Sequence, residues 1–354
     1  MQNLEDFAED DTLLEELRSE QARSSKLELK VRTLKLDLKE ALQLKEEYQL
    51  RASTYEAATS QKPPTWLTSK KKRKKDAVTI MAMLSDCHFD EIVKFSENGL
   101  NSYNREIAEM RLKLFVEKLI QLSYDQISNV NVEGLVLCLA GDLVSGNLHD
   151  LGEHNETPYG PVTCAYWSSQ LVAAIEALAK AFPKVHIVNV VGNHGRLTFK
   201  PRTAGRARDS WDWLIAHSAQ QMVQAKNVTW QIPESHDCLF NVYNTRILLT
   251  HGDAVRGGGG IGGIWPPIKR LQARLMVNKP HDLLIMGHWH QLTMAASAGL
   301  IVNGSLKGFD SYAAINGFSS EPAQQAWWVV SPTRGVTMQA PLFVENKENE
   351  GWAC

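Results

Sequence analysis

Five short segments of the chain combine Asp, Asn and His residues in patterns that could hold metal ions. In chain order they are Asp86-Cys87-His88, Gly141-Asp142, Gly192-Asn193-His194, His251-Gly252-Asp253 and Gly287-His288-Trp289-His290. Carboxylate and amide oxygens together with imidazole nitrogens form a mixed donor set, which suits Mn, Fe or Zn better than Mg or Ca. An isolated histidine near a strand end is more often structural than a ligand. The hypothesis therefore requires all five segments to meet in space.

Each of these segments follows an apolar run of strand-like length. The runs are 78–84, 135–140, 185–190, 246–250 and 282–286. In an open α/β sheet the carboxyl ends of parallel strands share one edge, so the loops that follow them converge on one crevice. The sequence therefore predicts a single site built from five loops.

The intervening segments predict the elements that position these loops. Helices are expected at about 102–124, 162–181 and 209–224, each after one of the first three strands. The C-terminal half predicts a hairpin of 239–243 with 246–250 and further short strands at 292–296, 300–302, 326–331 and 336–341. Two mixed sheets packed face to face, with helices outside, satisfy this pattern.

The five segments, in this order, resemble the motifs of the calcineurin-like metallophosphoesterase superfamily, closest in type to its nuclease and phosphodiesterase members. The resemblance covers about residue 77 to the C-terminal region and leaves the first seventy or so residues aside. It implies an α/β fold, a four-layer α/β/β/α sandwich of two mixed sheets. It also implies a metal-dependent phosphoesterase that hydrolyses phosphodiester bonds with a metal-bound hydroxide.

The resemblance assigns a role to seven candidate ligands of two divalent transition-metal ions. The first ion would be bound by Asp86, His88 and His290, the second by Asn193, His251 and His288, and Asp142 would bridge the two. An anionic oxygen between two cations about 4 Å apart offsets their repulsion, and such a pair can clamp a phosphoryl oxygen and lower the pKa of a bridging water. Manganese is the expected metal, with iron and zinc as alternatives.

His194 is the candidate catalytic residue, an acid that protonates the leaving oxygen. Many members of the superfamily carry Asp or Glu directly after this histidine, whereas this chain has Gly195 and then Arg196. Either another carboxylate supports His194, with Asp90 and Glu91 as the candidates, or its pKa is lower and catalysis is weaker.

Cations follow the His194 loop and are the candidate substrate-binding residues. They are Arg196, Lys200, Arg202 and Arg206, with Phe199 among them. Phosphate contacts and base stacking would use such a mixture, whereas a solvated loop before a helix is the alternative interpretation. The glycine-rich stretch 257–263 lacks a following Gly-Lys-Ser/Thr, so it is expected to form a flexible rim of the site and not a P-loop.

The first part of the chain has a different character. Residues 1–58 are expected to form a helical extension that self-associates as a coiled coil, because residues 11–55 lack Gly and Pro and carry an imperfect heptad pattern. A helix packed on the enzyme's own surface is the alternative. Residues 59–76 are predicted to be a basic linker, whose six cations at 70–75 either grip a phosphate backbone or form a solvated spacer. Residues 77–354 would form the metallophosphoesterase domain.

Composition limits the function classes. With 354 residues and a net charge of −2, the chain allows one large domain plus an appendage, and a nucleic-acid partner must meet a local patch. Five cysteines without a Cys-x-x-Cys pair favour a reducing compartment. The acidic start has no apolar signal segment and no run approaches eighteen apolar residues, so we expect a cytoplasmic protein without a membrane partner.

These observations favour a two-metal DNA nuclease that forms a homo-oligomer. The alternatives are a phosphomonoesterase or small-nucleotide phosphodiesterase, and a non-catalytic nucleic-acid-binding scaffold with a residual metal site. Protein Ser/Thr phosphatases are disfavoured because they usually continue Gly-Asp with Asp-Arg-Gly, whereas Leu143-Val144-Ser145-Gly146 follows Asp142 here.

Overall fold

The structure, a computed structural model, divides into two compact units, Met1–Ala57 and Ala58–Cys354. It describes residues 19–21, 23–39, 41, 42, 45, 64, 67, 77–146, 148, 155, 156, 160–202, 204–257 and 263–345. In the first unit residues 23–39 are helical, and their leucines are exposed. Residues 19–21, 41, 42 and 45 are helical too, and the other residues of the expected coiled coil lie outside the described residues, so self-association stays a prediction. Among the described helices, none has the length and apolar character needed to cross a bilayer.

The first sheet of the second unit contains six described strands in the spatial order β11-β10-β1-β2-β3-β4. Strands β1 to β4 are parallel to one another, because helical crossovers join them. Strand β10 pairs antiparallel with β1 on one side and with β11 on the other. The strands are β1 (Ala77–Leu84), β2 (Asn131–Leu139), β3 (Val185–Asn189), β4 (Val228–Gln231), β10 (Gln324–Ser331) and β11 (Gly335–Phe343). The crossover helices are α4 (Arg105–Tyr124), α5 (Gly160–Ala181) and α6 (Trp211–Met222), and the short α3 (Phe95–Asn98) precedes α4.

The second sheet contains five described strands in the order β5-β6-β7-β9-β8. Strands β6, β7 and β9 are parallel, and an antiparallel strand flanks them on each side. The strands are β5 (Asp237–Val242), β6 (Thr245–Thr250), β7 (Leu283–Met286), β8 (Thr293–Ala295) and β9 (Leu300–Val302). The remaining helices are α7 (Trp265–Asn278), η2 (Ala296–Ala298) and α8 (Ser311–Ile315).

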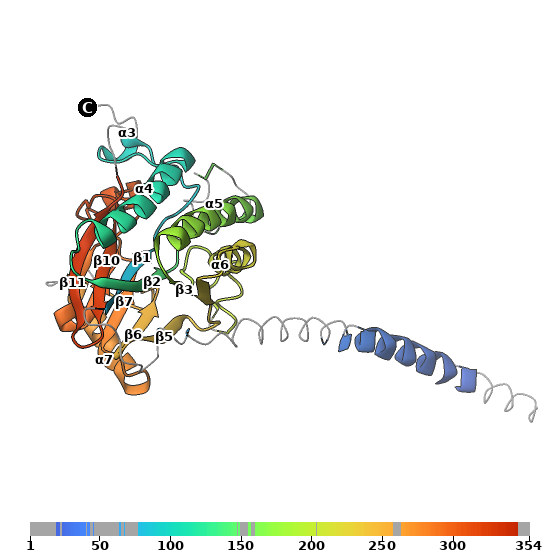
Figure 1. Ribbon diagram of the computed structural model, residues 1–354. Coiled ribbons are helices and arrows are strands. Elements are labelled where there is room, and N and C mark those ends of the chain that lie inside the picture. The colour runs from blue at the N-terminus through green and yellow to red at the C-terminus, as the bar shows by residue number, and fades with distance from the viewer. Residues whose placement is uncertain are drawn as a thin grey trace, which may run out of the picture. The chain divides into compact units, whose positions relative to one another are not determined.

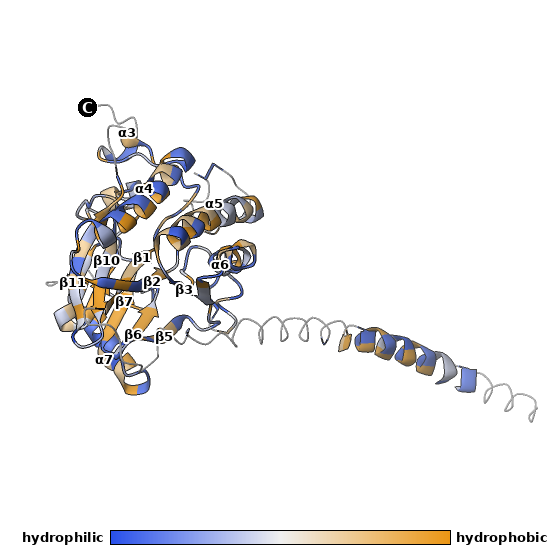
Figure 2. Ribbon diagram, in the orientation of Figure 1, coloured by the Kyte–Doolittle hydropathy of each residue, from blue (hydrophilic) through white to orange (hydrophobic). Residues whose placement is uncertain are grey.

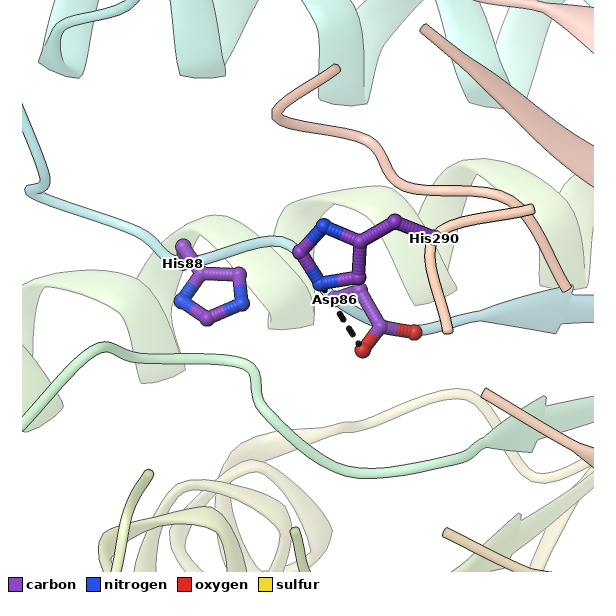
Figure 3. A group of neighbouring side chains, drawn as sticks. All are labelled: Asp86, His88 and His290. Atoms are coloured by element: carbon purple, nitrogen blue, oxygen red, sulfur yellow. Dashed lines mark ion pairs between the residues drawn. The ribbon is translucent and has the colours of Figure 1, made fainter. Parts of the chain in front are cut away.

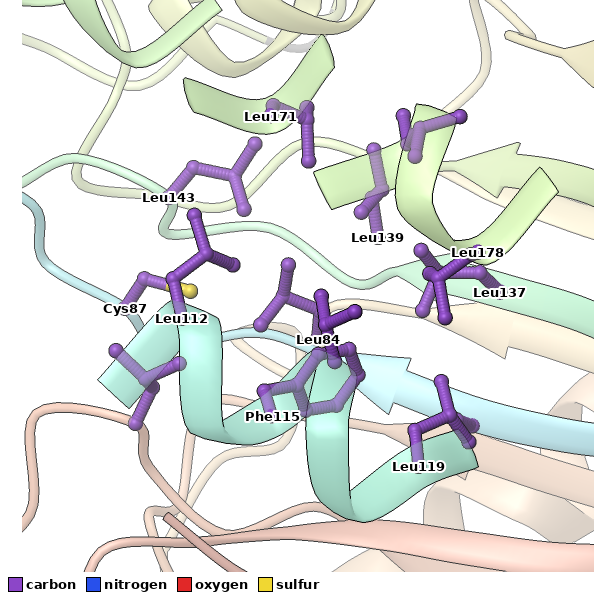
Figure 4. Close-up of a cluster of buried hydrophobic side chains, with 14 of the residues drawn as sticks. Leu84, Cys87, Leu112, Phe115, Leu119, Leu137, Leu139, Leu143, Leu171 and Leu178 are labelled. Carbon is purple, nitrogen blue, oxygen red and sulfur yellow. The ribbon is translucent and has the colours of Figure 1, made fainter. Parts of the chain in front are cut away.

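Three apolar clusters separate four layers. Alternate side chains of β1 point to opposite faces, so Ile80 and Leu84 pack against α4 and α5 while Met81 and Met83 face the second sheet. Figure 4 shows the helix side of this arrangement, and Figure 2 shows apolar residues on β6 and β7. Leu248 of β6 belongs to a third cluster, which α7 covers from the other side (Figure 1). The expected α/β/β/α sandwich of two mixed sheets is confirmed.

Five elements of the second unit were not predicted from the sequence: the short α3, η2 and α8, and also β4 and α7. Strand β4 has only four residues and no apolar run, so its pattern is too short to recognise. Helix α7 follows a glycine-rich stretch and contains Pro266-Pro267, which resembles a break, yet proline is compatible with the first turn of a helix because no N–H is required there. Residues 258–262 before α7 lie outside the described residues, and a flexible rim there stays a prediction.

Leu67 lies within the range expected to be a linker, but it packs into the domain. Its side chain is fully buried in the core between the two sheets. Its carbonyl accepts a hydrogen bond from the backbone N–H of Tyr243 at 3.2 Å, and its own N–H donates to the carbonyl of Pro64 at 2.9 Å. At this point the segment before β1 contributes to the hydrophobic core. The basic run 70–75 lies outside the described residues.

Candidate metal centre

The five polar segments come together at one edge of the two sheets. Each follows the carboxyl end of a strand: Asp86 and His88 follow β1, Asp142 follows β2, Asn193 and His194 follow β3, His251 follows β6, and His288 and His290 follow β7. Three sets of potential ligand atoms lie within 4.8 Å of one another: Asp86 with His88 and His290, His88 with Asp142 and His194, and Asp142 with His251 and His288. The convergence expected from the sequence is therefore present among the described residues.

The distances define two halves of the centre. In the first, Nε2 of His290 lies 3.4 Å from Oδ1 of Asp86, and the His88 ring lies beside them (Figure 3). In the second, Nε2 of His251 lies 2.9 Å from Oδ2 of Asp142 and 3.1 Å from Oδ1 of Asn193. Asn193, which has no charge, thus joins the second half through its amide oxygen.

Burial and charge set the protonation of the histidines. Burial lowers the pKa of His88 to about 4, and the nearby Lys307 ammonium adds to this effect. Burial and the charge of His251 lower the pKa of His288 to about 4. Burial also disfavours the charged form of His251, but the Asp142 carboxylate outweighs it and raises the pKa of His251 to about 10. His88 and His288 are therefore neutral at pH 7, the form that a candidate ligand needs, whereas His251 holds a proton that a metal ion would displace.

Glycines precede the ligands because the loops approach one another too closely for a side chain. A Cβ atom on Gly192 would lie 2.0 Å from Oδ1 of Asp142, and one on Gly287 would lie 2.4 Å from Oδ2 of Asp86. A Cβ on Gly141 would lie 2.4 Å from the Gly192 nitrogen, and φ there is +89°. The Gly-Asp, Gly-Asn-His and Gly-His motifs thus have a steric cause.

The backbone is strained at five of the seven candidate ligands. Left-handed φ angles occur at Asp86 (51°), His88 (47°), Asp142 (50°), His288 (72°) and His290 (54°). Residues with a Cβ atom adopt this region at a cost of roughly 1–2 kcal/mol each, and such residues cluster at functional sites. The strain is thus located where the metal ligands are expected.

The carboxylates suggested as support for His194 contact other groups. Oxygens of Asp90 accept hydrogen bonds from Arg105 at 2.8 Å and from Trp167 at 3.0 Å, which fixes the loop after β1. Oε1 of Glu91 accepts a hydrogen bond of 2.8 Å from Nζ of the buried Lys307. Its other oxygen, Oε2, lies 3.3 Å from Nδ1 of His88. Glu91 therefore lies behind a candidate metal ligand. The His194 ring packs edge-on against the His88 ring, with 4.7 Å between centroids, and burial lowers its pKa.

One buried carboxylate at the site was missed in the sequence. Asp212, in the first turn of α6, accepts hydrogen bonds from the backbone N–H groups of Asp142 and Leu143, both at 3.0 Å, and of Gly192 at 2.8 Å. In the sequence it stands between Trp211 and Trp213. The one local signal for it is Ser210, which caps the helix two residues before it. Its partners are 70 and 20 residues away along the chain, so no local pattern could reveal them.

The candidate substrate-binding cations have two kinds of environment. The Arg196 guanidinium donates to the backbone carbonyls of Asn193 and, at 3.2 Å, of Thr198. Arg206 forms a 2.8 Å ion pair with Asp253, so it ties its loop to the loop of His251. By contrast, Lys200 and Arg202 are exposed, as is Phe199 at 77% of its surface. The exposed surface after His194 is therefore basic and aromatic, while Arg196 and Arg206 contact the ligand-bearing loops.

No protein-family model matches the chain, and no curated protein matches it. Similar solved structures include a predicted phosphoesterase from Streptococcus pneumoniae TIGR4, at 11% identity and a TM-score of 0.31 over 75% of this chain and 98% of the other. A hypothetical protein from Pyrococcus horikoshii OT3 has 12% identity and a TM-score of 0.39 over 77% and 91%. Vps29 from Entamoeba histolytica in complex with Zn²⁺ has 12% identity and a TM-score of 0.30 over 74% and 99%.

The two mixed sheets, the outer helices and the order of five ligand-bearing loops make the chain similar in fold to the calcineurin-like metallophosphoesterases. Its Asp and His clusters are candidate sites for divalent metal ions.

Proposed function

We propose that the protein is a metal-dependent phosphodiesterase that acts on DNA. The observation that carries the proposal is the position of Asp142, which belongs to two of the three ligand groups and therefore lies between the two halves of the centre. A carboxylate shared in this way is suited to two cations close together, because its negative charge offsets their repulsion. Asp86, His88 and His290 would hold one ion and Asn193, His251 and His288 the other.

Two divalent ions bound there would supply positive charge for phosphoryl oxygens and lower the pKa of a water molecule. The protein contributes the arrangement around them. Asp86 and Asp142 are fully buried, so their charges are poorly screened and attract cations strongly. Mn²⁺ is the proposed metal, and Fe²⁺ and Zn²⁺ satisfy the same donor set.

His194 is the proposed proton donor to the leaving oxygen. Its backbone N–H donates to Oδ1 of Asp142 at 2.8 Å, which holds the residue next to the shared carboxylate. Its ring contacts His88, so a phosphoryl group bound between the two halves would lie near an imidazole.

Nucleic acid is the proposed substrate because of the surface after His194. Lys200 and Arg202 can contact phosphates, and the exposed Phe199 ring can stack on a base. The basic run 70–75 would add phosphate contacts from outside the described residues.

Purified protein tests the proposal with Asp142→Asn and, as a matched control, Asp125→Asn at the exposed end of α4. We expect the wild type and the control to bind two Mn²⁺ per chain and to cleave a bis-ester dye and labelled DNA. Asp142→Asn should lose metal and both activities together while remaining folded. Normal turnover by Asp142→Asn would contradict the assignment of the site.

A second experiment separates DNA from small substrates. Lys200→Ala combined with Arg202→Ala should raise KM for DNA several-fold and flatten its dependence on salt, with little change for the dye ester. Lys113→Ala with Lys118→Ala removes the same charge from α4 and is the control. Equal effects of the two double variants on DNA cleavage would mean that Lys200 and Arg202 belong to a solvated loop that does not bind substrate. A small phosphoester would then be the proposed substrate.

A further inference from the structure

The loops of β2 and β3 are joined at the metal centre by one side chain from outside both of them. Oδ2 of Asp212 accepts from the N–H groups of Asp142 and Gly192, and Oδ1 accepts from that of Leu143. The carboxylate is fully buried at the start of α6. Among the described residues it belongs to none of the three ligand groups.

We infer that Asp212 is a positioning residue that sets the spacing between Asp142 and the Asn193 loop, and thereby the affinity of the second metal half. The inference rests on the proposed function, because it concerns the same centre. Asp142 and Asn193 both contribute to the second half, and Asp212 binds the backbone of Asp142 and of the residue before Asn193. Movement of either loop would change the distance between two ligands of one ion.

The chemistry of the contact requires a carboxylate. All three partners are N–H donors, and an ionised carboxylate offers only acceptors. An asparagine at this position would present its NH₂ group to at least one of these N–H groups. One buried donor would then face another, and the loops would separate or rotate to relieve the conflict.

The backbone of Gly195 also lies next to the Asp212 carboxylate. A Cβ atom on Gly195 would lie 3.0 Å from Oδ1 and 3.1 Å from Cγ of Asp212. Gly195 is not among the residues with positive φ, so its backbone accepts an L side chain. An aspartate at 195 would therefore direct its carboxylate into the space that the Asp212 carboxylate fills.

Relocation of the carboxylate tests the inference. The full chain is compared as wild type, Asp212→Asn, Gly195→Asp, the double variant Gly195→Asp/Asp212→Ala, and the control Asp209→Asn, which removes a charge just before α6. Mn²⁺ affinity and stoichiometry are measured by calorimetry, and the magnetic coupling of bound Mn²⁺ pairs is measured by electron paramagnetic resonance. Thermal unfolding without metal reports the fold.

We expect Asp212→Asn to bind the second Mn²⁺ roughly 10–100-fold more weakly and to lose the coupled Mn²⁺ signal, as other groups that orient ligands do. Gly195→Asp should also bind more weakly, because two carboxylates compete for one space. The double variant should recover most of the affinity and the coupled signal. The control should match the wild type.

Three outcomes would overturn the inference. One is wild-type affinity and coupling in a folded Asp212→Asn. Another is a folded double variant that binds no better than Asp212→Asn. The third is unfolding of both, which would make the carboxylate a requirement of the fold and not of the spacing. If the wild type itself binds no Mn²⁺ pair, the proposed function fails first and the inference falls with it, a result distinct from the other three.

Discussion

Oε2 of Glu91 lies 3.3 Å from Nδ1 of His88, on the side of the ring away from the candidate metal. The Ser145 hydroxyl lies 2.8 Å from the same nitrogen and donates to Glu91. Nδ1 therefore carries the proton of the neutral ring, and Nε2, which has no hydrogen-bond partner among the described residues, is left as the ligand atom. Glu91 itself is held by the buried Lys307, which also contacts Asp310.

Glu91→Gln should weaken Mn²⁺ binding roughly 10–100-fold, because the hydrogen bonds that run from Nδ1 of His88 through Ser145 to Glu91 lose the carboxylate charge that fixes the tautomer and orientation of the ring. Lys307 keeps Asp310 as a partner, so we expect a loss of only about 1–3 kcal/mol in the free energy of unfolding. Calorimetric Mn²⁺ titration and denaturant unfolding measure the two effects. Glu117→Gln, on the exposed face of α4, is the control, and equal Mn²⁺ affinity in both variants would remove the role given to Glu91.

His194→Ala should retain both metal ions but lose rate selectively. A leaving group with a high pKa needs a proton as its bond to phosphorus breaks, whereas an activated phenolate does not. We expect a loss of about 10²–10⁴-fold on DNA and a much smaller loss on a nitrophenyl bis-ester. Comparison of kcat on the two substrates measures the difference, and the same loss on both would argue for a structural role of the ring.

The stability of the metal-free protein should decrease as pH rises from about 6.5 to about 10. His251 binds a proton in the folded state up to a pKa of about 10, above its usual value, so its interaction with Asp142 stabilises the fold below pH 6.5 and is lost as pH rises through 10. Mn²⁺ affinity should increase over the same window, because the ion displaces that proton. Denaturant unfolding in chelator and Mn²⁺ titration at several pH values measure both trends. The decrease should be smaller in His251→Gln, and an unchanged slope would assign it to other groups.

Removal of residues 1–57 should convert an oligomer to a smaller species without changing the activity on a small ester, because every candidate ligand lies downstream. The cut must spare Leu67, since this side chain is buried in the core between the sheets. A cut at this point also retains the basic run 70–75, so oligomer formation is tested separately from phosphate binding. Light scattering of both proteins decides the matter. If both have the same number of subunits, the N-terminal helix does not mediate association.

The sequence predicted the elements with long repetitive signals and the residues with distinctive chemistry. Apolar runs followed by Asp, Asn or His located the ligand loops, because an abrupt change from buried strand to polar loop is visible locally. The side chains that position the candidate metal-binding residues were harder to predict. Asp212 and Lys307 act through partners far along the chain, and the sequence near each is that of an ordinary helix start or loop. These contacts form only when folding brings distant loops together, so a local sequence pattern does not reveal them.

The left-handed backbone conformation at five candidate ligand positions lowers the stability of the folded protein. At roughly 1–2 kcal/mol each, these residues together disfavour the folded state by an amount comparable to the net stability of many domains, about 5–15 kcal/mol. Glycine at the same positions would relieve the strain and abolish the donors. A chain without a metal site would therefore gain stability by losing these residues, whereas under the proposed function metal binding offsets the cost of keeping five strained donors.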